Sequence, residues 1–410
     1  MNLKAISSIS AAHPNAATAR EERSQSAPPR LLYVVSEDWY FLSHRLPMAR
    51  AARDAGFEVH VATNVQDGAP AIEAEHFILH PIPFARGRLS PLASLRTIAA
   101  LRRVHRAVSP AVTHHVSLQP SVLGLIAALG RPTACVNALT GLGYSFTSQD
   151  AKAKAVRLVI GPVLRLLLER ERSFNLVQNE DDRAALMGLG IAKSRIVLIP
   201  GSGVDVTRLR PLPEPTGPPT VAFVGRLLDD KGIRCLVEAH RLLRARGSQA
   251  QLLIAGTPDP ANPASVTAEE AASWNRTPGI SWLGYVEDIP GLWARAHVAA
   301  LPSRREGLPL SLLEAAACAR AMVATDVPGC REIVVAGETG LLVPVNDARA
   351  LADAIDRLLR DPRLRAQFAA AARRRAVERF SAEVVGRQIV SLYRGLLQTS
   401  DPAFAGAGQQ

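Results

Sequence analysis

The chain has 410 residues, of which 48% are hydrophobic, and its 48 Lys and Arg against 37 Asp and Glu give a formal net charge of +11. This length predicts two or three domains with sizeable apolar cores. No apolar run reaches about 18 residues without a charge, which argues against a membrane-spanning helix. The four cysteines lack metal-ligand spacing, and a reducing, cytoplasmic compartment is therefore expected.

The positive charge predicts an acidic partner, which could be nucleic acid, an anionic membrane or a phosphorylated substrate. Aromatic residues make up only 5% of the chain. The sequence has no zinc-finger spacing and does not interleave basic with aromatic residues as RNA-binding modules do. The composition therefore favours a phosphorylated substrate and a membrane surface over nucleic acid.

The N-terminal part of the chain predicts a disordered lead-in followed by a β/α domain. Residues 1–29 are rich in Ala, Ser, Pro and Arg and lack the apolar segment of a secretory signal. Short apolar strands are expected at about 31–35 and 58–62, with a helix over about 43–55 between them. This is a βαβ unit, and its crossover should be right-handed.

Two basic amphipathic helices are expected in the same domain, over about 92–107 and 151–171. The second either packs on the sheet or rests on an anionic membrane. Between them we expect a strand that ends at His114 and His115, a helix over about 120–129 and a strand over about 133–137. Strands at about 174–178 and 195–199 close the domain.

A glycine-rich turn at 200–205 and five prolines between 211 and 219 mark a linker, after which the β/α alternation restarts. Strands are expected at 220–224, 252–256, 280–284 and 298–301, and a last amphipathic helix at 381–397. We therefore predict an α/β protein of two doubly wound domains, 30–204 and 205–380, with a final helix at 381–398 and a flexible tail at 399–410. Ligands should bind in the cleft at the carboxyl ends of the strands.

One candidate anion site follows the first strand of the second domain. Gly225 and Arg226 come directly after this strand, and Lys231 lies five residues beyond Arg226, where a helix begins. Arginine offers a planar fork to phosphate oxygens and lysine a compact charge. The spacing predicts an anion site, although two surface cations would give the same pattern.

A second candidate lies where a loop runs into a helix, over residues 303–315. Gly307 permits close approach of a ligand, and Pro309 suits the first helical position. The free N–H groups of Leu308 to Leu310 would face an anion. Glu306 in the loop and Glu314 in the helix could then approach one ligand from different distances.

The second candidate resembles the E-x7-E element of retaining glycosyltransferases of family 4. The blocks at 325–334 and 337–344, and the G-R-x4-K-G pattern at Arg226 to Lys231, are similar to other segments of that family. The resemblance covers about residues 31–398. It departs from the family after the first strand, where residues 39–47 replace the glycine loop that many members have.

The resemblance implies a GT-B fold, in which the last helix crosses back to the first domain. It implies that Arg226 and Lys231 bind the donor diphosphate, together with Gly225 and the 307–310 turn. Glu314 would then contact the nucleotide ribose and Glu306 the transferred sugar. His115, and after it His114, would touch the donor sugar or the acceptor.

The activity implied is retaining transfer of a sugar from a nucleotide-diphosphate donor. The chain has no D-x-D motif, so we expect no metal and no cofactor. The glycine-bearing loop at 140–146 resembles the loop of family members that extend lipid-linked oligosaccharides. With the basic helices, this resemblance implies a lipid-diphosphate-linked saccharide acceptor in surface polysaccharide synthesis. The protein would then work on the cytoplasmic face of a membrane.

Two other functions fit parts of the pattern. A nucleotide-sugar epimerase can share the two-domain architecture, but it would act on the donor without an acceptor. A basic protein that binds membrane or nucleic acid would have no need for the diphosphate motif together with E-x7-E.

Overall fold

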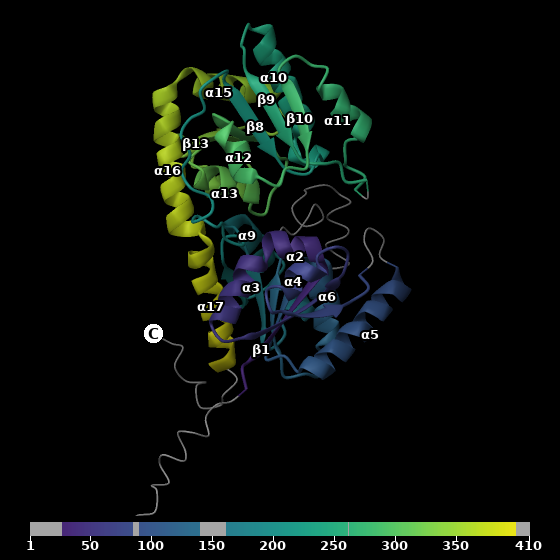
Figure 1. Cartoon of the computed structure of the whole chain (residues 1–410). Coiled ribbons are helices and arrows are strands. Elements are labelled where there is room, and N and C mark those ends of the chain that lie inside the picture. Colours follow the sequence, from purple (N-terminus) through teal and green to yellow (C-terminus); the bar gives the residue numbers. More distant parts are fainter. Residues whose placement is uncertain (1–26, 85–89, 140–160, 261, 399–410) are drawn as a thin grey trace, which may run out of the picture.

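The computed structural model describes residues 27–84, 90–139, 161–260 and 262–398. These residues form two α/β domains stacked one above the other, joined by a hinge and by a long C-terminal helical segment (Figure 1). The expected loop at 140–146 and the first part of the expected helix at 151–171 lie outside the described residues, and residues 161–168 are helical.

The N-terminal domain is built on a parallel sheet of seven described strands in the order β3-β2-β1-β4-β5-β6-β7. The central strands are apolar and buried on both faces, as parallel strands covered by helices require. The strands are β1 (Arg30–Glu37), β2 (Glu58–Asn64), β3 (Ile78–Pro81), β4 (Val112–Val116), β5 (Ala134–Ala138), β6 (Ser173–Val177) and β7 (Ile196–Leu198). The named helices are α2 (Asp38–His44), α3 (Leu46–Asp54), α4 (Ala69–Glu73), α5 (Pro91–Val108), α6 (Leu118–Ala127) and α9 (Glu180–Gly188).

The expected helix over 43–55 corresponds to α3, and a further helix that the sequence did not predict, α2, precedes it and ends just before Arg45. Arg45 has φ −124° and ψ −14°, outside helical values, and its side chain is fully buried. Its Nη1 donates a hydrogen bond to Ser202 Oγ at 2.8 Å, in the hinge. This contact with the hinge lies at the break between α2 and α3, and the sequence pattern predicted neither α2 nor the break.

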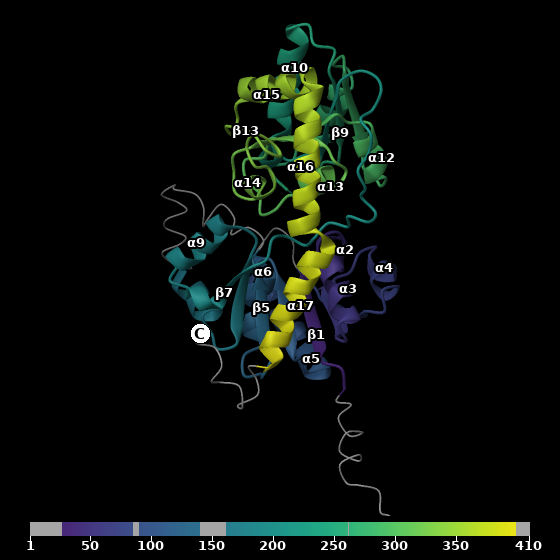
Figure 2. The same cartoon turned by 90° about the vertical axis from the view of Figure 1, so that its left-hand side faces the viewer.

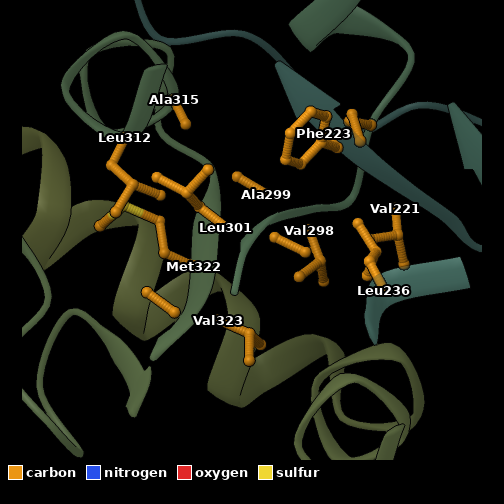
Figure 3. Close-up of a cluster of buried hydrophobic side chains, with 14 of the residues drawn as sticks. Val221, Phe223, Leu236, Val298, Ala299, Leu301, Leu312, Ala315, Met322 and Val323 are labelled. Carbon is orange, nitrogen blue, oxygen red and sulfur yellow. The ribbon is translucent and has the colours of Figure 1, made fainter. Parts of the chain in front are cut away.

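The C-terminal domain repeats the architecture with six described parallel strands in the order β10-β9-β8-β11-β12-β13. The strands are β8 (Thr220–Val224), β9 (Gln251–Ala255), β10 (Ile280–Gly284), β11 (Val298–Leu301), β12 (Ala321–Thr325) and β13 (Gly340–Val343). The helices are α10 (Ile233–Ala245), α11 (Ala268–Trp274), α12 (Ile289–Ala294), α13 (Leu310–Ala317), α14 (Cys330–Ile333), α15 (Ala348–Arg360) and α16 (Pro362–Phe380). Figure 3 shows part of the buried core between the sheet and its helices, including Val221, Phe223, Leu301 and Met322.

The last helix, α17 (Ala382–Gln398), leaves the C-terminal domain and packs on the N-terminal one. Figure 2 shows α16 and α17 running one below the other along the side of both domains. Tyr393 of α17 places its hydroxyl 2.9 Å from that of Tyr33 in β1 and 2.5 Å from Nδ1 of His114 in β4. The predicted fold, two Rossmann-like domains with a helix that crosses back, is confirmed.

The hinge passes close to the start of α17. Gly203 has φ +83°, and a Cβ there would lie 2.6 Å from Ala382 Cα. The next residue, Val204, donates its N–H to Phe380 O and accepts a hydrogen bond from Ala382 N–H, both at 2.8 Å. Only glycine at position 203 lets the hinge and the start of α17, the two segments that join the domains, approach this closely.

Candidate active site

Two loops meet at the carboxyl edge of the second sheet. The first follows β8 and ends at Gly232, which has φ +69°. A Cβ at Gly232 would lie 1.9 Å from the carbonyl oxygen of Pro302, in the loop after β11. Glycine is therefore required for the contact that brings Lys231 beside the loop that carries Glu306.

Lys231 and Glu306 form an ion pair, with Nζ 2.6 Å from Oε1. Ser303 Oγ donates to the same carboxylate oxygen at 2.7 Å. Only 8% of the glutamate side chain and 23% of the lysine side chain are exposed. The structure thus pairs Lys231, which is predicted to bind the diphosphate, with Glu306, which is predicted to contact the sugar.

Arg226 also has a carboxylate partner, because its Nη1 lies 2.9 Å from Asp259 Oδ2. Asp259 follows β9, its backbone N–H donates to Ser265 Oγ at 2.8 Å, and only 9% of the residue is exposed. The sequence reasoning did not identify Asp259, because nothing in its local pattern distinguishes it from any other loop aspartate. Both predicted diphosphate cations therefore carry a counter-ion that an arriving anion would replace or share.

The loop between Glu306 and α13 lies against the N-terminal domain. The carbonyl oxygen of Gly307 accepts a hydrogen bond from Asn179 Nδ2 at 3.0 Å. A Cβ on Gly201 of the hinge would lie 2.4 Å from Leu308 Cδ2. Pro309 is not the first helical residue but precedes it as the N-cap, with ψ 115°. The first N–H groups of α13 lack intrahelical acceptors, as at any helix start.

Glu314 lies in the second turn of α13 with protein on most sides. Burial raises the pKa of its carboxyl to about 7, and the nearby Arg208 opposes this shift. A glutamate in such surroundings exchanges its proton near neutral pH and can accept hydrogen bonds from a ligand hydroxyl once it is ionised.

His114 and His115 lie inside the N-terminal domain with no exposed surface. The His114 ring stacks on Tyr33 at 4.9 Å, and burial, Arg45 and His115 hold its pKa well below the usual value. His115 faces the other side of the sheet, where Nδ1 lies 2.9 Å from Asn137 Oδ1. The structure does not bring either ring to Glu306 or Lys231, and their contact with a substrate stays a prediction.

A cavity of about 860 Å³ lies beside the hinge, lined by parts of α3, α17 and residues 204–207. None of the cationic or acidic residues named above lines it. Within the described residues no group of three or more His, Cys, Asp or Glu could hold a metal ion. In the same part of the chain, no helix is both long and apolar enough to cross a membrane.

Comparison with known proteins agrees with this geometry. Residues 30–177 match the glycosyl transferase 4-like family model, and residues 218–361 match the glycosyl transferases group 1 model. The first range contains strands β1 to β6, and the second contains strands β8 to β13.

The chain is 26% identical over 375 residues to N,N'-diacetylbacillosaminyl-diphospho-undecaprenol alpha-1,3-N-acetylgalactosaminyltransferase of Campylobacter jejuni, covering 86% of this chain and 97% of that protein. It is 31% identical over 366 residues to alpha-maltose-1-phosphate synthase of Mycolicibacterium smegmatis, covering 82% and 90%. Among solved structures, sucrose-phosphate synthase from Thermosynechococcus elongatus superposes with a TM-score of 0.75 at 23% identity, over 90% of this chain and 100% of that one. The chain therefore belongs to glycosyltransferase family 4 and is a glycosyltransferase with the GT-B fold.

Proposed function

We propose that this glycosyltransferase moves a sugar from a nucleotide-diphosphate donor to an acceptor hydroxyl, with retention of configuration and without a metal ion. The observation that carries the proposal is the cluster of Arg226, Lys231 and Glu306 at the carboxyl edge of the second sheet. Two cations and a helix start are a suitable site for a diphosphate. The Glu306 carboxylate, held 2.6 Å from Lys231, would then lie close to the sugar attached to that diphosphate.

The same groups would act on the reaction itself. As the bond between the anomeric carbon and the diphosphate oxygen breaks, negative charge develops on the leaving group. Arg226 and Lys231 would stabilise this charge. The acceptor oxygen forms the new bond to the anomeric carbon, and the proton of the acceptor hydroxyl passes to the departing diphosphate. Glu306 would hold the sugar while its carbon changes partner.

The acceptor we propose is a lipid-diphosphate-linked saccharide. The name of the Campylobacter jejuni relative describes transfer to a saccharide on diphospho-undecaprenol. Such an acceptor presents its sugar at a membrane surface, and the protein would have to approach that surface.

Helix α5 offers a surface for this approach. Leu92 and Leu95 are 58% and 62% exposed, and the arginines Arg96, Arg102, Arg103 and Arg106 are exposed on the same helix. Leucine side chains can enter the interface while arginines face anionic headgroups. We therefore propose reversible binding of this helix to an anionic membrane.

The test is incubation of the purified protein with a panel of UDP-, GDP- and ADP-sugars, with and without a lipid-diphosphate-linked saccharide, in the presence of EDTA. We expect one donor to release its nucleoside diphosphate only when the acceptor is present, and the product to keep the anomeric configuration of the donor. Release or isomerisation without an acceptor would indicate an epimerase. Activity lost in EDTA and restored by a divalent ion would refute the metal-independent mechanism.

A further inference from the structure

The helix that replaces the glycine loop lies at the face of the N-terminal domain turned towards the second domain. Both views place α2 there, next to the hinge (Figures 1 and 2). It follows β1 directly and ends at His44. The carboxyl end of a central parallel strand is where doubly wound sheets bind ligands.

The contacts of His44 fix its orientation and its tautomer. Its ring lies parallel to that of Tyr40, with centroids 4.3 Å apart and 7° between the planes. Ser43 Oγ lies 2.7 Å from Nδ1 and donates its hydrogen to Trp39 O at 2.7 Å. Because a hydroxyl has one hydrogen to donate, Nδ1 carries the proton of the neutral ring and donates to Ser43. Nε2 is then left without a hydrogen.

Arg45, the next residue, carries a buried positive charge beside this ring. No part of it is exposed, and among the described residues its Nε and Nη2 have no hydrogen-bond partner. Its Nη1 donates to Ser202, and the neighbouring Gly201 packs on Leu308, in the loop between Glu306 and α13. Contacts therefore run from the junction of α2 and α3 through the hinge to the loop between Glu306 and α13. A buried cation without a counter-ion is unfavourable until an anion approaches.

The other cations near His44 belong to the second domain. Burial, Arg45, Lys231 and Arg226, in that order, lower the pKa of the imidazole to about 3. The positive charges of Lys231 and Arg226, on the loop after β8, therefore act on the imidazole of His44 from the second domain. The carboxylates of Glu306 and Asp259 are bound to those two cations.

We propose that His44 is a ligand of the donor diphosphate, supplied by the N-terminal domain opposite Arg226 and Lys231. This rests on the proposed function, since it requires a diphosphate in the cleft. The phosphate charges would offset the three cations that favour the neutral form of His44. Nε2 would then take a proton from solvent and donate it in a hydrogen bond to a phosphate oxygen. Because the ring and the two cations come from different domains, the bound diphosphate would hold the domains together.

The experiment is calorimetric titration of the full-length protein with UDP, GDP and ADP, each separately. Four proteins are compared: wild type, His44→Gln, Arg226→Ala and the control His76→Asn. His76 is an exposed histidine with φ +60°, which asparagine adopts readily. We expect His44→Gln to weaken binding of the preferred nucleotide about ten-fold or more, as loss of a hydrogen bond to a charged group does. His76→Asn should leave the affinity unchanged.

Proton uptake separates a ligand from a merely structural residue. Titrations at pH 6 in buffers of different ionisation enthalpy should show that wild type takes up more protons than His44→Gln, by about one per nucleotide bound. The difference between the two proteins cancels the ionisation of the nucleotide itself. Unchanged affinity and unchanged uptake in His44→Gln, with weakened binding in Arg226→Ala, would refute the role of His44 and leave the proposed function standing. If wild type bound none of the three nucleotides, both the role of His44 and the proposed function would be refuted.

Discussion

Glu306 combines a charge-dependent contact with one that needs no charge. In Glu306→Gln the amide oxygen can still accept from Ser303, but the ion pair with Lys231 is lost. We expect turnover to fall roughly 100-fold or more, in line with the loss of one electrostatic contact in an active site. Nucleoside diphosphate affinity should be kept or should rise, because Lys231 loses a competing partner. Turnover with the donor and acceptor found in the panel, and calorimetry, measure the two effects.

The matched control is Glu338→Gln, which removes the same charge from an exposed position in the same domain. Its turnover and affinity should equal those of wild type. A well-folded Glu306→Gln enzyme with normal turnover would remove Glu306 from the sugar site.

Glu314 predicts a pH dependence of stability. Below pH 4.5, the ordinary value, the carboxyl is protonated in both the folded and the unfolded chain. Between pH 4.5 and about 7 the folded protein keeps this proton and the unfolded chain loses it. The free energy of unfolding therefore falls as the pH rises through this window, by up to about 3 kcal/mol. Because the side chain keeps some exposed surface, this is an upper limit.

Urea unfolding of wild type and Glu314→Gln at pH 5 and pH 8 measures this contribution. The glutamine variant should gain stability relative to wild type on going from pH 5 to pH 8. Equal differences at the two pH values would show that Glu314 is ionised throughout.

Local motifs identified Arg226, Lys231 and Glu306 as candidate ligands, but they did not predict how these residues pair. Lys231 and Glu306 are 75 residues apart, and Arg226 and Asp259 are 33 apart. Such pairings depend on which loops meet at the sheet edge, and this is a property of the folded domain. The roles assigned to the cluster stay predictions.

At the scale of elements, α5 carries the prediction on membrane binding. Changing Arg102, Arg103 and Arg106 to Gln should weaken binding to anionic vesicles roughly 100-fold, since each cation contributes about 1 kcal/mol near such a surface. Co-sedimentation with anionic and with neutral vesicles measures the change.

The control removes three exposed arginines from the other domain: Arg349, Arg363 and Arg374. It has the same net charge as the α5 variant and should bind vesicles as wild type does. Equal loss in both variants would show that only net charge matters, and equal binding to both vesicle types would exclude electrostatic attraction.

Sequence periodicity located most elements, and its errors have identifiable causes. The strands expected at 220–224, 280–284 and 298–301 begin and end at these residues, because continuous apolar runs are typical of buried parallel strands. Strand β3 was not predicted because it is a short edge strand in which Ile78 is 45% exposed. Its residues therefore lack a continuous apolar pattern.

At the scale of the whole molecule, the N-terminal domain depends on α17. Val385, Ile389, Tyr393 and Leu396 are buried in its core, and burying four such side chains contributes on the order of 6–10 kcal/mol. This is comparable with the total stability of a domain. A chain that ends at Ser381 should therefore lose the cooperative unfolding of its N-terminal domain.

Hydrogen exchange resolved by domain tests this expectation. Amides of β1 and β4 should lose protection in the shortened chain, while those of β8 and β11 keep it. A chain that ends at Gln398 is the control and should match wild type. Full protection of β1 in the shortened chain would show that the first domain folds without α17.

The crossing of α17 has a further consequence for how the protein is made. A ribosome synthesises the seven described strands of the first domain long before it adds the residues of α17 that cover one face of their sheet. About 180 residues separate the hinge from α17, and at roughly 5–20 residues per second their synthesis takes on the order of 10 to 40 seconds. During this time the apolar face that receives Tyr393 is bare on the nascent chain. The second domain, which needs no later segment, is therefore the first to complete its core, although it is synthesised last.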